Sequence, residues 1–280
     1  MARELIDTHQ HLWVMSERAY SWIEPAYGPL YDDFTPERLA PEIPASGVTG
    51  SVLVQAADTY DDTFYMLDIA AHSDFVRGVV GWVPLCDGSV EGYLDKYASH
   101  EKIVGFRHVL HDEPDDNFML RQDFNAGIRA LGRYPLCYDL LIFEKHLPQT
   151  IQFADMHPGL SMVVDHIAKP VIRRNQFDHA WAANIRQLAK REHVCCKLSG
   201  MVTEVRDGAW DEQLLKPYFD VVLEAFGPYR LMFGSDWPVA NLGGTYLQIV
   251  ELAEALTSGL SPSETEFFWH KSAAAAYRLA

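Results

Sequence analysis

The sequence Leu5-Ile6-Asp7-Thr8-His9-Gln10-His11 holds the strongest structural signal in the chain. An apolar pair leads into two histidines two positions apart, and side chains two apart on a strand point to the same face. Near the other end, Arg230-Leu231-Met232-Phe233-Gly234-Ser235-Asp236-Trp237-Pro238 is another apolar run that reaches an acid, followed by a proline that cannot continue a sheet. Both stretches predict strands whose C-terminal ends carry polar side chains.

Eight apolar segments of six or seven residues occur along the chain. Most are apolar throughout, which is typical of parallel strands covered on both faces. Helical segments separate them, and this repeated alternation predicts the α/β class, with a single (β/α)8 barrel as one domain over residues 1–280. The predicted strands are Glu4–His9, Ser51–Ala56, Gly78–Pro84, Ile103–Val109, Leu136–Ile142, Ser161–His166, Val194–Ser199 and Arg230–Asp236.

The helical segments have apolar residues at helical spacing. In the last of them, Ser263 is followed three residues later by Glu266, which predicts a capping box at the start of a final helix, Ser263–Leu279. The other predicted helices are Thr63–Ala70, Asp123–Leu131, Leu147–Asp155, Ala180–Lys190, Gln213–Phe226 and Tyr246–Leu256.

Residues 10–50 separate the first two predicted strands and are rich in proline and aromatic residues. We expect this segment to form a long first βα loop that folds over the catalytic end of the barrel. An open doubly wound sheet is the structural alternative. That fold predicts a glycine-rich first turn for phosphate, whereas the first turn here is His-Gln-His.

Composition limits the classes of function. A formal net charge of −16 over 280 residues favours solubility and argues against binding to nucleic acid or to an anionic membrane surface. The four cysteines lack C-x-x-C spacing and are expected as small apolar residues in a reducing compartment. Without a signal-like start or an apolar run of spanning length, we expect a cytoplasmic protein; a homo-oligomer is compatible with the sequence.

Polar residues at the C-terminal ends of barrel strands form the site in folds of this kind. Here a carboxylate near imidazoles could act as general base toward water, and an arginine with an imidazole could polarise a carbonyl group. Each candidate also has a structural interpretation as a hydrogen-bonded core, turn or ion-pair residue, and Lys197 is expected to pack on the barrel floor. No G-x-S-x-G elbow occurs around Ser235, so we predict hydrolysis by activated water. The candidates are His9, His11, Arg107, His108, His166 and Asp236.

Four motifs carry a family resemblance: D-x-H-x-H at residues 7–11, V-x-D-H-x-x-K-P at 163–170, K-L-S-G at 197–200 and F-G-S-D-W-P at 233–238. Together they resemble the amidohydrolase superfamily, and more closely its sugar-acid lactonase family. The resemblance implies that Asp236 activates a water molecule, while His166 and Arg107 act on the lactone carbonyl.

The resemblance also bears on metal binding. Metal-dependent members of the superfamily carry a histidine, or a bridging lysine or glutamate, around the fourth and fifth strands, whereas the fifth strand here ends Cys137-Tyr138-Asp139. His9, His11 and Asp236 could still hold a divalent ion such as zinc or manganese, and Asp139 could join them. Because lactones are activated esters, we expect no required metal.

The acidic background and the scarcity of arginines argue against a dicarboxylated pyrone, which would need several bidentate contacts. Hydroxyl partners and aromatic side chains favour a sugar lactone, an aldono-1,4- or 1,5-lactone such as a fucono-lactone. A metal-dependent decarboxylase of an aromatic or muconate-type acid is the alternative on the same scaffold, and a non-catalytic carboxylate-binding barrel is a more distant one. The expected substrate-binding residues are His9, His11, His108, Trp22, Glu204 and Trp237.

Overall fold

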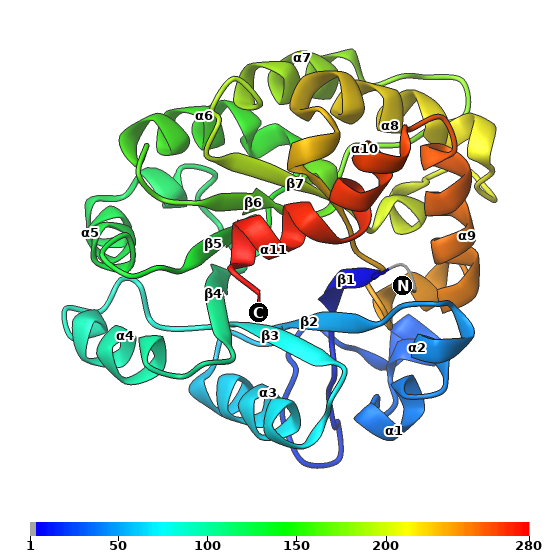
Figure 1. Cartoon of the computed structure of the whole chain (residues 1–280). Helices are drawn as coiled ribbons and strands as arrows, with labels where there is room; N and C mark the ends of the chain where they lie inside the picture. Colours follow the sequence, from blue (N-terminus) through cyan, green and yellow to red (C-terminus); the bar gives the residue numbers. More distant parts are fainter. Residues whose placement is uncertain (1–3, 280) are drawn as a thin grey trace.

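The computed structural model describes residues 4–279, in which eight parallel strands pair in chain order. Helices form a ring around these strands (Figure 1). The structure is thus a single (β/α)8 barrel, and all eight predicted strands are confirmed with small shifts at their ends. The strands are β1 (Ile6–Gln10), β2 (Gly50–Val54), β3 (Val76–Gly81), β4 (Ile103–His108), β5 (Cys137–Leu140), β6 (Met162–Val164), β7 (Val194–Leu198) and β8 (Leu231–Phe233).

The first and last strands are joined by hydrogen bonds that close the barrel. The Asp236 amide donates to the His9 carbonyl at 2.8 Å, and the His11 amide donates to the Trp237 carbonyl at 2.8 Å. The buried carboxylate of Asp7 accepts the His9 amide at 3.0 Å and the Ser235 amide at 2.8 Å. This closure brings the two motif-bearing ends of the chain to one place.

Within the described residues, seven helices surround the barrel, and the six predicted before the C-terminal segment are confirmed. The unpredicted helix is α4, which is short, contains Gly92 and buries Val90, Leu94 and Tyr97. No helix within residues 4–279 is long and apolar enough to cross a membrane. The seven are α3 (Tyr60–His72), α4 (Val90–Ala98), α5 (Gln122–Leu131), α6 (Leu147–Met156), α7 (His179–Leu188), α8 (Glu212–Phe226) and α9 (Tyr246–Thr257).

The C-terminal segment corrects one prediction. Its first helix, α10 (Pro262–Glu266), is capped by Ser261 in a capping box with Glu264, so the expected cap Ser263 lies inside the helix. Pro262 explains the difference, because its fixed φ and missing N–H suit the first helical position. A π-helical turn at Phe267–Lys271 and α11 (Ser272–Tyr277) follow.

Helix α11 lies across one end of the barrel (Figure 1). Ala273, Ala276 and Tyr277 pack into the cluster of apolar side chains that includes Ile6, near the beginning of β1. The hydroxyl of Tyr277 donates to the buried carboxylate of Asp139 on β5 at 2.8 Å. The helix therefore covers the end of the barrel opposite to the C-terminal ends of the strands.

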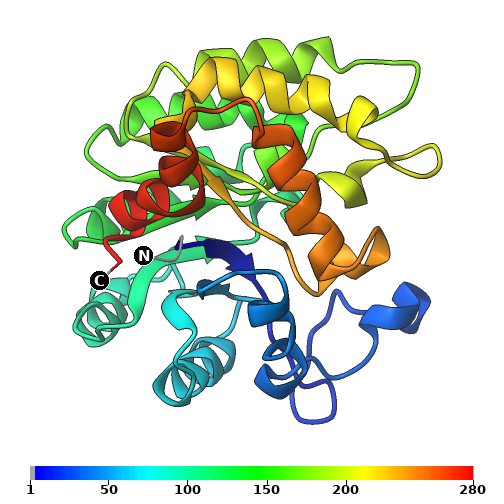
Figure 2. The same cartoon turned by 45° about the vertical axis from the view of Figure 1, so that its right-hand side comes forward.

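The long segment between β1 and β2 contains a 3₁₀ turn, Pro25–Leu30, and two short helices, α1 (Pro36–Leu39) and α2 (Glu42–Ala45). Figure 2 shows this blue segment beside the barrel, with α2 close to α9. Trp13 is its buried centre, with ring centroids 5.2 Å from Phe34 and 5.5 Å from Trp22. Much of the aromatic content of this segment therefore packs its own loop.

Candidate active site

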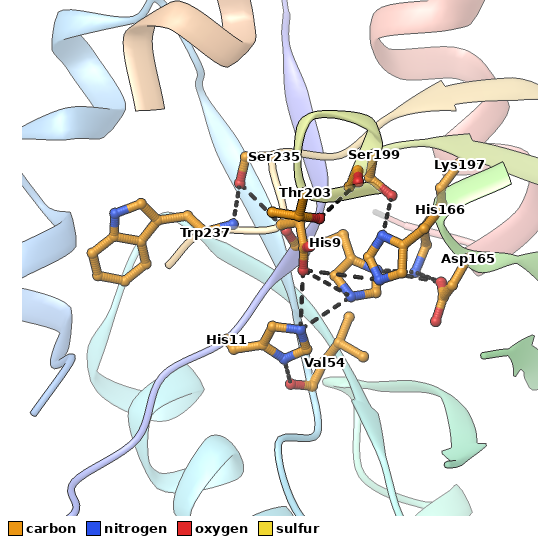
Figure 3. Close-up of polar contacts among 12 residues, drawn as sticks. His9, His11, Val54, Asp165, His166, Lys197, Ser199, Thr203, Ser235 and Trp237 are labelled. Carbon is orange, nitrogen blue, oxygen red and sulfur yellow. Dashed lines mark hydrogen bonds and ion pairs between the residues drawn. The ribbon is translucent and has the colours of Figure 1, made fainter. Parts of the chain in front are cut away.

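Three imidazoles, from β1, the residue after it and the turn after β6, face one carboxylate that follows β8. The Nε2 atoms of His9, His11 and His166 lie 3.9, 3.5 and 3.8 Å from Oδ1 of Asp236. All four side chains are buried. Figure 3 shows the three histidines close together, with Asp165 and Lys197 on one side of them. The structure therefore brings together four residues that the sequence placed on separate strands.

Arg107 of β4 is the fifth predicted member of this cluster. Its Nη1 lies 3.3 Å from Nε2 of His9 and donates to Oδ2 of Asp165 at 3.0 Å, while its Nη2 donates to the carbonyl of Gln55 at 2.6 Å. These contacts hold the buried guanidinium in a fixed position. Arg107 is therefore a preorganised positive charge beside the histidines.

His166 lies in an unusual turn. The φ angles of His166, Ile167, Ala168 and Lys169 are +52°, +49°, +61° and +44°, all in the left-handed region. For residues with a side chain, this conformation costs roughly 1–2 kcal/mol each. The Trp181 indole stabilises the turn by donating to the Ile167 carbonyl at 2.7 Å. Strain of this kind persists only where the surrounding structure enforces it, and it is frequent at functional sites.

Residues after β7 orient the His166 ring. Ser199 Oγ lies 2.8 Å from His166 Nδ1. Gly200 has a φ of +63°, and a Cβ atom added there would lie 2.7 Å from His166 Nδ1. Any larger residue at position 200 would therefore displace the ring. If the Ser199 hydroxyl donates to Nδ1, the proton of the neutral ring is on Nε2, which faces Asp236.

A buried ion network lies below His9. Lys197 of β7 contacts Asp139 Oδ2 at 2.6 Å and Asp165 Oδ1 at 2.9 Å. Burial raises the pKa of Asp139 to about 6, although Lys197 opposes this shift. Burial also opposes ionisation of Asp165, yet Lys197, His9 and Arg107 hold its pKa well below the usual value. Lys197 thus lies in the barrel interior and stabilises two carboxylates there.

The protonation states of the central groups follow from burial. Burial lowers the pKa of both His9 and His166 well below the usual value, so both rings are neutral near pH 7. Burial opposes ionisation of Asp236, but His166 and His11 more than offset it and lower its pKa. The site therefore presents an ionised carboxylate to neutral imidazoles, which suits proton transfer from water.

His9, His11 and Asp236 are also a possible set of metal ligands, since their donor atoms lie within 4.8 Å of one another. The His11 Nδ1 atom donates to the Val54 carbonyl at 2.8 Å, so when the ring is neutral Nε2 is a bare nitrogen facing His9 Nε2 at 3.1 Å. Two protonation states of His9 differ in this contact, and the first of them supplies its donor. With the proton on Nε2 it donates to His11, and with the proton on Nδ1, next to Asp165, it presents a second bare nitrogen.

The second state is the one that a metal ion requires. Two imidazoles and one carboxylate match zinc in ligand number and type, with open positions for water or substrate. The carboxylate of Asp165, 3.3 Å from His9 Nδ1, is the kind of outer partner that orients a metal-binding histidine. The residues therefore fit a divalent ion, and in the first state the two histidines hydrogen bond to each other without one.

Four predicted substrate-binding residues lie outside this cluster. His108 follows Arg107 on β4, so its side chain points to the opposite face of the strand from the inward Arg107. Its ring stacks on Phe118, and its Nε2 atom lies 2.6 Å from Oε1 of Glu113. Trp22 donates to the Ala56 carbonyl at 2.7 Å.

The other two of these residues are engaged by the protein as well. Glu204 pairs with Lys169 and Arg206 through its two carboxylate oxygens. Trp237 is buried, with its ring centroid 5.3 Å from that of Phe34. The side chains of all four residues thus have structural partners in the protein.

Sequence reasoning missed several residues that shape the site. Asp165 and Lys169 belong to the V-x-D-H-x-x-K-P motif, and Ser199 and Gly200 belong to K-L-S-G. The two motifs contain these residues, but His166 was the one predicted to act in the site, and Lys197 was expected to pack on the barrel floor. Their tight grouping around His166 explains why these short motifs matter together.

The chain is a (β/α)8 barrel with a cluster of histidines and a carboxylate at its mouth, and comparison with known proteins identifies its family. The amidohydrolase family matches residues 6–279. The chain is 37% identical to an L-fucono-1,5-lactonase from Burkholderia multivorans over 284 residues, covering 98% of this chain and 96% of that protein. It is 38% identical over 242 residues to an L-fucono-1,5-lactonase from Burkholderia ambifaria, covering 86% and 82% of the two chains.

A crystal structure of an amidohydrolase from Burkholderia multivorans with bound zinc superposes with a TM-score of 0.93 at 37% identity, covering 99% of both chains. The chain therefore belongs to the amidohydrolase family. The fold and the family expected from the four motifs are both confirmed.

Proposed function

We propose that the protein hydrolyses a sugar lactone, an aldono-1,5- or 1,4-lactone such as L-fucono-1,5-lactone, to the aldonic acid. The observation that carries this proposal is the convergence of His9, His11 and His166 on the ionised Asp236. The likeness to two L-fucono-1,5-lactonases supports the choice of lactone. A carboxylate-centred site of this kind suits attack by water on an ester carbonyl.

In the proposed mechanism, Asp236 accepts a proton from a water molecule, whose oxygen forms a bond to the lactone carbonyl carbon. The bond between that carbon and the ring oxygen then breaks, and the proton returns to the ring oxygen. His166 donates from Nε2 to the carbonyl oxygen, and the fixed charge of Arg107 stabilises the developing oxyanion. The products are a hydroxyl group and a carboxylic acid on one open chain, and the acid then ionises to a carboxylate and releases a proton to solvent.

A metal ion fits the same residues. His9, His11 and Asp236 would hold it, and it would supply Lewis-acid activation and lower the pKa of a bound water molecule. Lactones are activated esters, and without an ion His9 can donate to His11 across their 3.1 Å contact. We therefore propose that lactone opening does not require the ion.

The charges of the site support a neutral substrate. Two cations, Arg107 and Lys197, face three carboxylates, Asp139, Asp165 and Asp236. Both Nη atoms of Arg107 already have protein partners. A dicarboxylate would therefore find little free positive charge at the base of the site, and Lys169 at its edge could bind one carboxylate but not two. A polyol lactone adds no charge.

A pH-indicator screen over a panel of aldono-lactones tests the proposal, because ring opening releases an acid. We expect opening of at least one aldono-lactone above the buffer rate, and similar rates after chelator treatment. Loss of activity on chelation, with recovery in zinc or manganese, would overturn the metal-independent mechanism. Release of carbon dioxide from aromatic acids, with no lactone opened, would identify the decarboxylase instead.

A further inference from the structure

Lys169 is a cation beside the site that the proposed mechanism leaves without a role. It ends the left-handed turn that begins with His166, and its amide donates to the His166 carbonyl at 2.8 Å. Its Nζ atom donates to Oε1 of the buried Glu204 at 2.9 Å. The side chain is 15% exposed, so the ammonium group is held in place yet accessible to solvent.

The hydrogen-bond donors of the three neighbouring cations differ in availability. Lys197 is fully buried between Asp139 and Asp165, and the Nη atoms of Arg107 are engaged by Asp165 and Gln55. An ammonium group has three donors. Within residues 4–279, Glu204 is the acceptor that the structure gives to Lys169. Lys169 therefore has donors left for a ligand.

Lys169 is tied to the centre of the site through His166. It lies three residues after His166 in the same left-handed turn. Burial, followed by Lys169 and Arg107, lowers the pKa of the nearby His111 to about 3. The ammonium group is therefore held beside the turn of His166, and its neighbour His111 is neutral.

Ring opening creates a requirement that this cation can meet. A neutral ester becomes a carboxylate next to the ionised Asp236, in a cluster where buried carboxylates outnumber cations. Two like charges at close range disfavour each other unless a third group compensates. A held ammonium group with free donors supplies this compensation for the oxyanion and for the product.

We propose that Lys169 is a catalytic residue that hydrogen bonds to the acyl oxygens of the lactone and pairs with the carboxylate of the opened product. Glu204 is its positioning residue, because Glu204 fixes the ammonium group from the turn after β7. This inference rests on the proposed lactone hydrolysis. It gives Glu204 an indirect role in substrate binding through Lys169.

The test compares Lys169→Met with wild type in two measurements, kcat/KM for the lactone and calorimetric binding of the aldonate product. Loss of a charge-assisted hydrogen bond should lower both by about 10- to 100-fold. Lys169→Arg, which retains the charge, should recover most of the aldonate affinity. Because methionine and arginine both keep a Cβ atom, the left-handed backbone at position 169 is equally strained in all three proteins. Thermal unfolding checks that each variant is folded, and Lys169→Gln replaces a variant that is not.

Arg206→Gln is the matched control. Arg206 pairs with the other carboxylate oxygen of Glu204, but its side chain is 42% exposed. Like Lys169→Met, Arg206→Gln removes one positive charge from the Glu204 carboxylate. We expect kcat/KM and aldonate affinity to change by less than threefold. Unchanged kcat/KM and aldonate affinity in Lys169→Met, or an equal loss in Arg206→Gln, would overturn the assignment.

The binding measurement keeps this assignment separate from the proposed function. If wild type opens no lactone but binds the aldonate through Lys169, the proposed function fails and the assignment of Lys169 as an acyl-oxygen ligand stands. If wild type opens the lactone but Lys169→Met binds the aldonate and turns over the lactone normally, the proposed function stands and the assignment of Lys169 fails. Absence of aldonate binding to wild type would overturn the assignment directly.

Discussion

Replacing Gly200 with alanine should disturb the site through His166. At a φ of +63°, alanine adopts a left-handed backbone at a cost of roughly 1–2 kcal/mol. The new Cβ atom would also lie 2.7 Å from Nδ1 and 2.9 Å from Cγ of His166. Overpacking of this kind typically costs about 1–3 kcal/mol, so we expect a total loss of about 2–5 kcal/mol in the free energy of unfolding.

The effect on activity follows from the same contact. A displaced His166 ring loses its hydrogen bond with Ser199 and its approach to Asp236, which are 2.8 and 3.8 Å in the native structure. A misplacement of about 1 Å in a reacting group can cost around 10²-fold in rate. We therefore expect kcat for lactone opening to fall by roughly 10- to 100-fold in Gly200→Ala.

Gly47→Ala separates backbone strain from the contact with His166. Gly47 has a φ of +76°, and a Cβ atom there would meet nothing within 4 Å. Urea unfolding and initial rates should show a loss of about 1–2 kcal/mol and unchanged kcat in Gly47→Ala. Wild-type kcat in a folded Gly200→Ala protein would refute the role of Gly200 in orienting His166.

Three further predictions address the buried charges and the bond that is cleaved. Lys197→Met leaves Asp139 and Asp165 without their shared cation and should lower the free energy of unfolding in urea by about 3–5 kcal/mol. The control Lys216→Met removes a cation from an exposed ion pair and should change this free energy by less than about 0.5 kcal/mol. Equal losses in the two variants would contradict the stabilising role of the buried network. Burial raises the pKa of Asp62 to about 6, so the folded state retains a proton that the unfolded chain releases near pH 4. The stability that this bound proton contributes is therefore lost as pH rises from 4 to 6. Asp62→Asn should flatten the pH dependence of urea unfolding in that window, and an unchanged slope would argue against this shift. Turnover in ¹⁸O-water should place one label in the product carboxylate and none in the new hydroxyl group, and mass spectrometry showing label in the hydroxyl would exclude attack at the acyl carbon.

The strands and the central cluster were predictable for a physical reason. Parallel strands covered on both faces read as continuous apolar runs, and a residue at the C-terminal end of such a strand belongs to the barrel mouth. His9, His11, Arg107, His166 and Asp236 all follow this rule, and the structure brings them together. The side-chain alternation along β4 could also have shown that His108 faces away from Arg107.

Other features depend on contacts that the sequence does not display. The left-handed turn at His166 is stabilised by Trp181, which follows it by 15 residues, and by Ser199 on the next strand. Residues with side chains rarely adopt this conformation, so local propensity argues against it. The ion network of Lys197 joins residues from three neighbouring strands. The inward direction of the Lys197 side chain follows from closure of the barrel and is not shown by the local sequence. Such tertiary contacts override local preferences.

The most direct test of lactone hydrolysis centred on Asp236 is the initial rate of L-fucono-1,5-lactone opening by wild type and by Asp236→Asn, measured side by side with a pH indicator. Asparagine keeps the shape of the side chain but cannot accept the proton from water. Wild type should open the lactone well above the buffer rate, and the variant should be slower by at least about 10²-fold. Equal rates in the two folded proteins would contradict the mechanism, and no opening by wild type would contradict the activity itself.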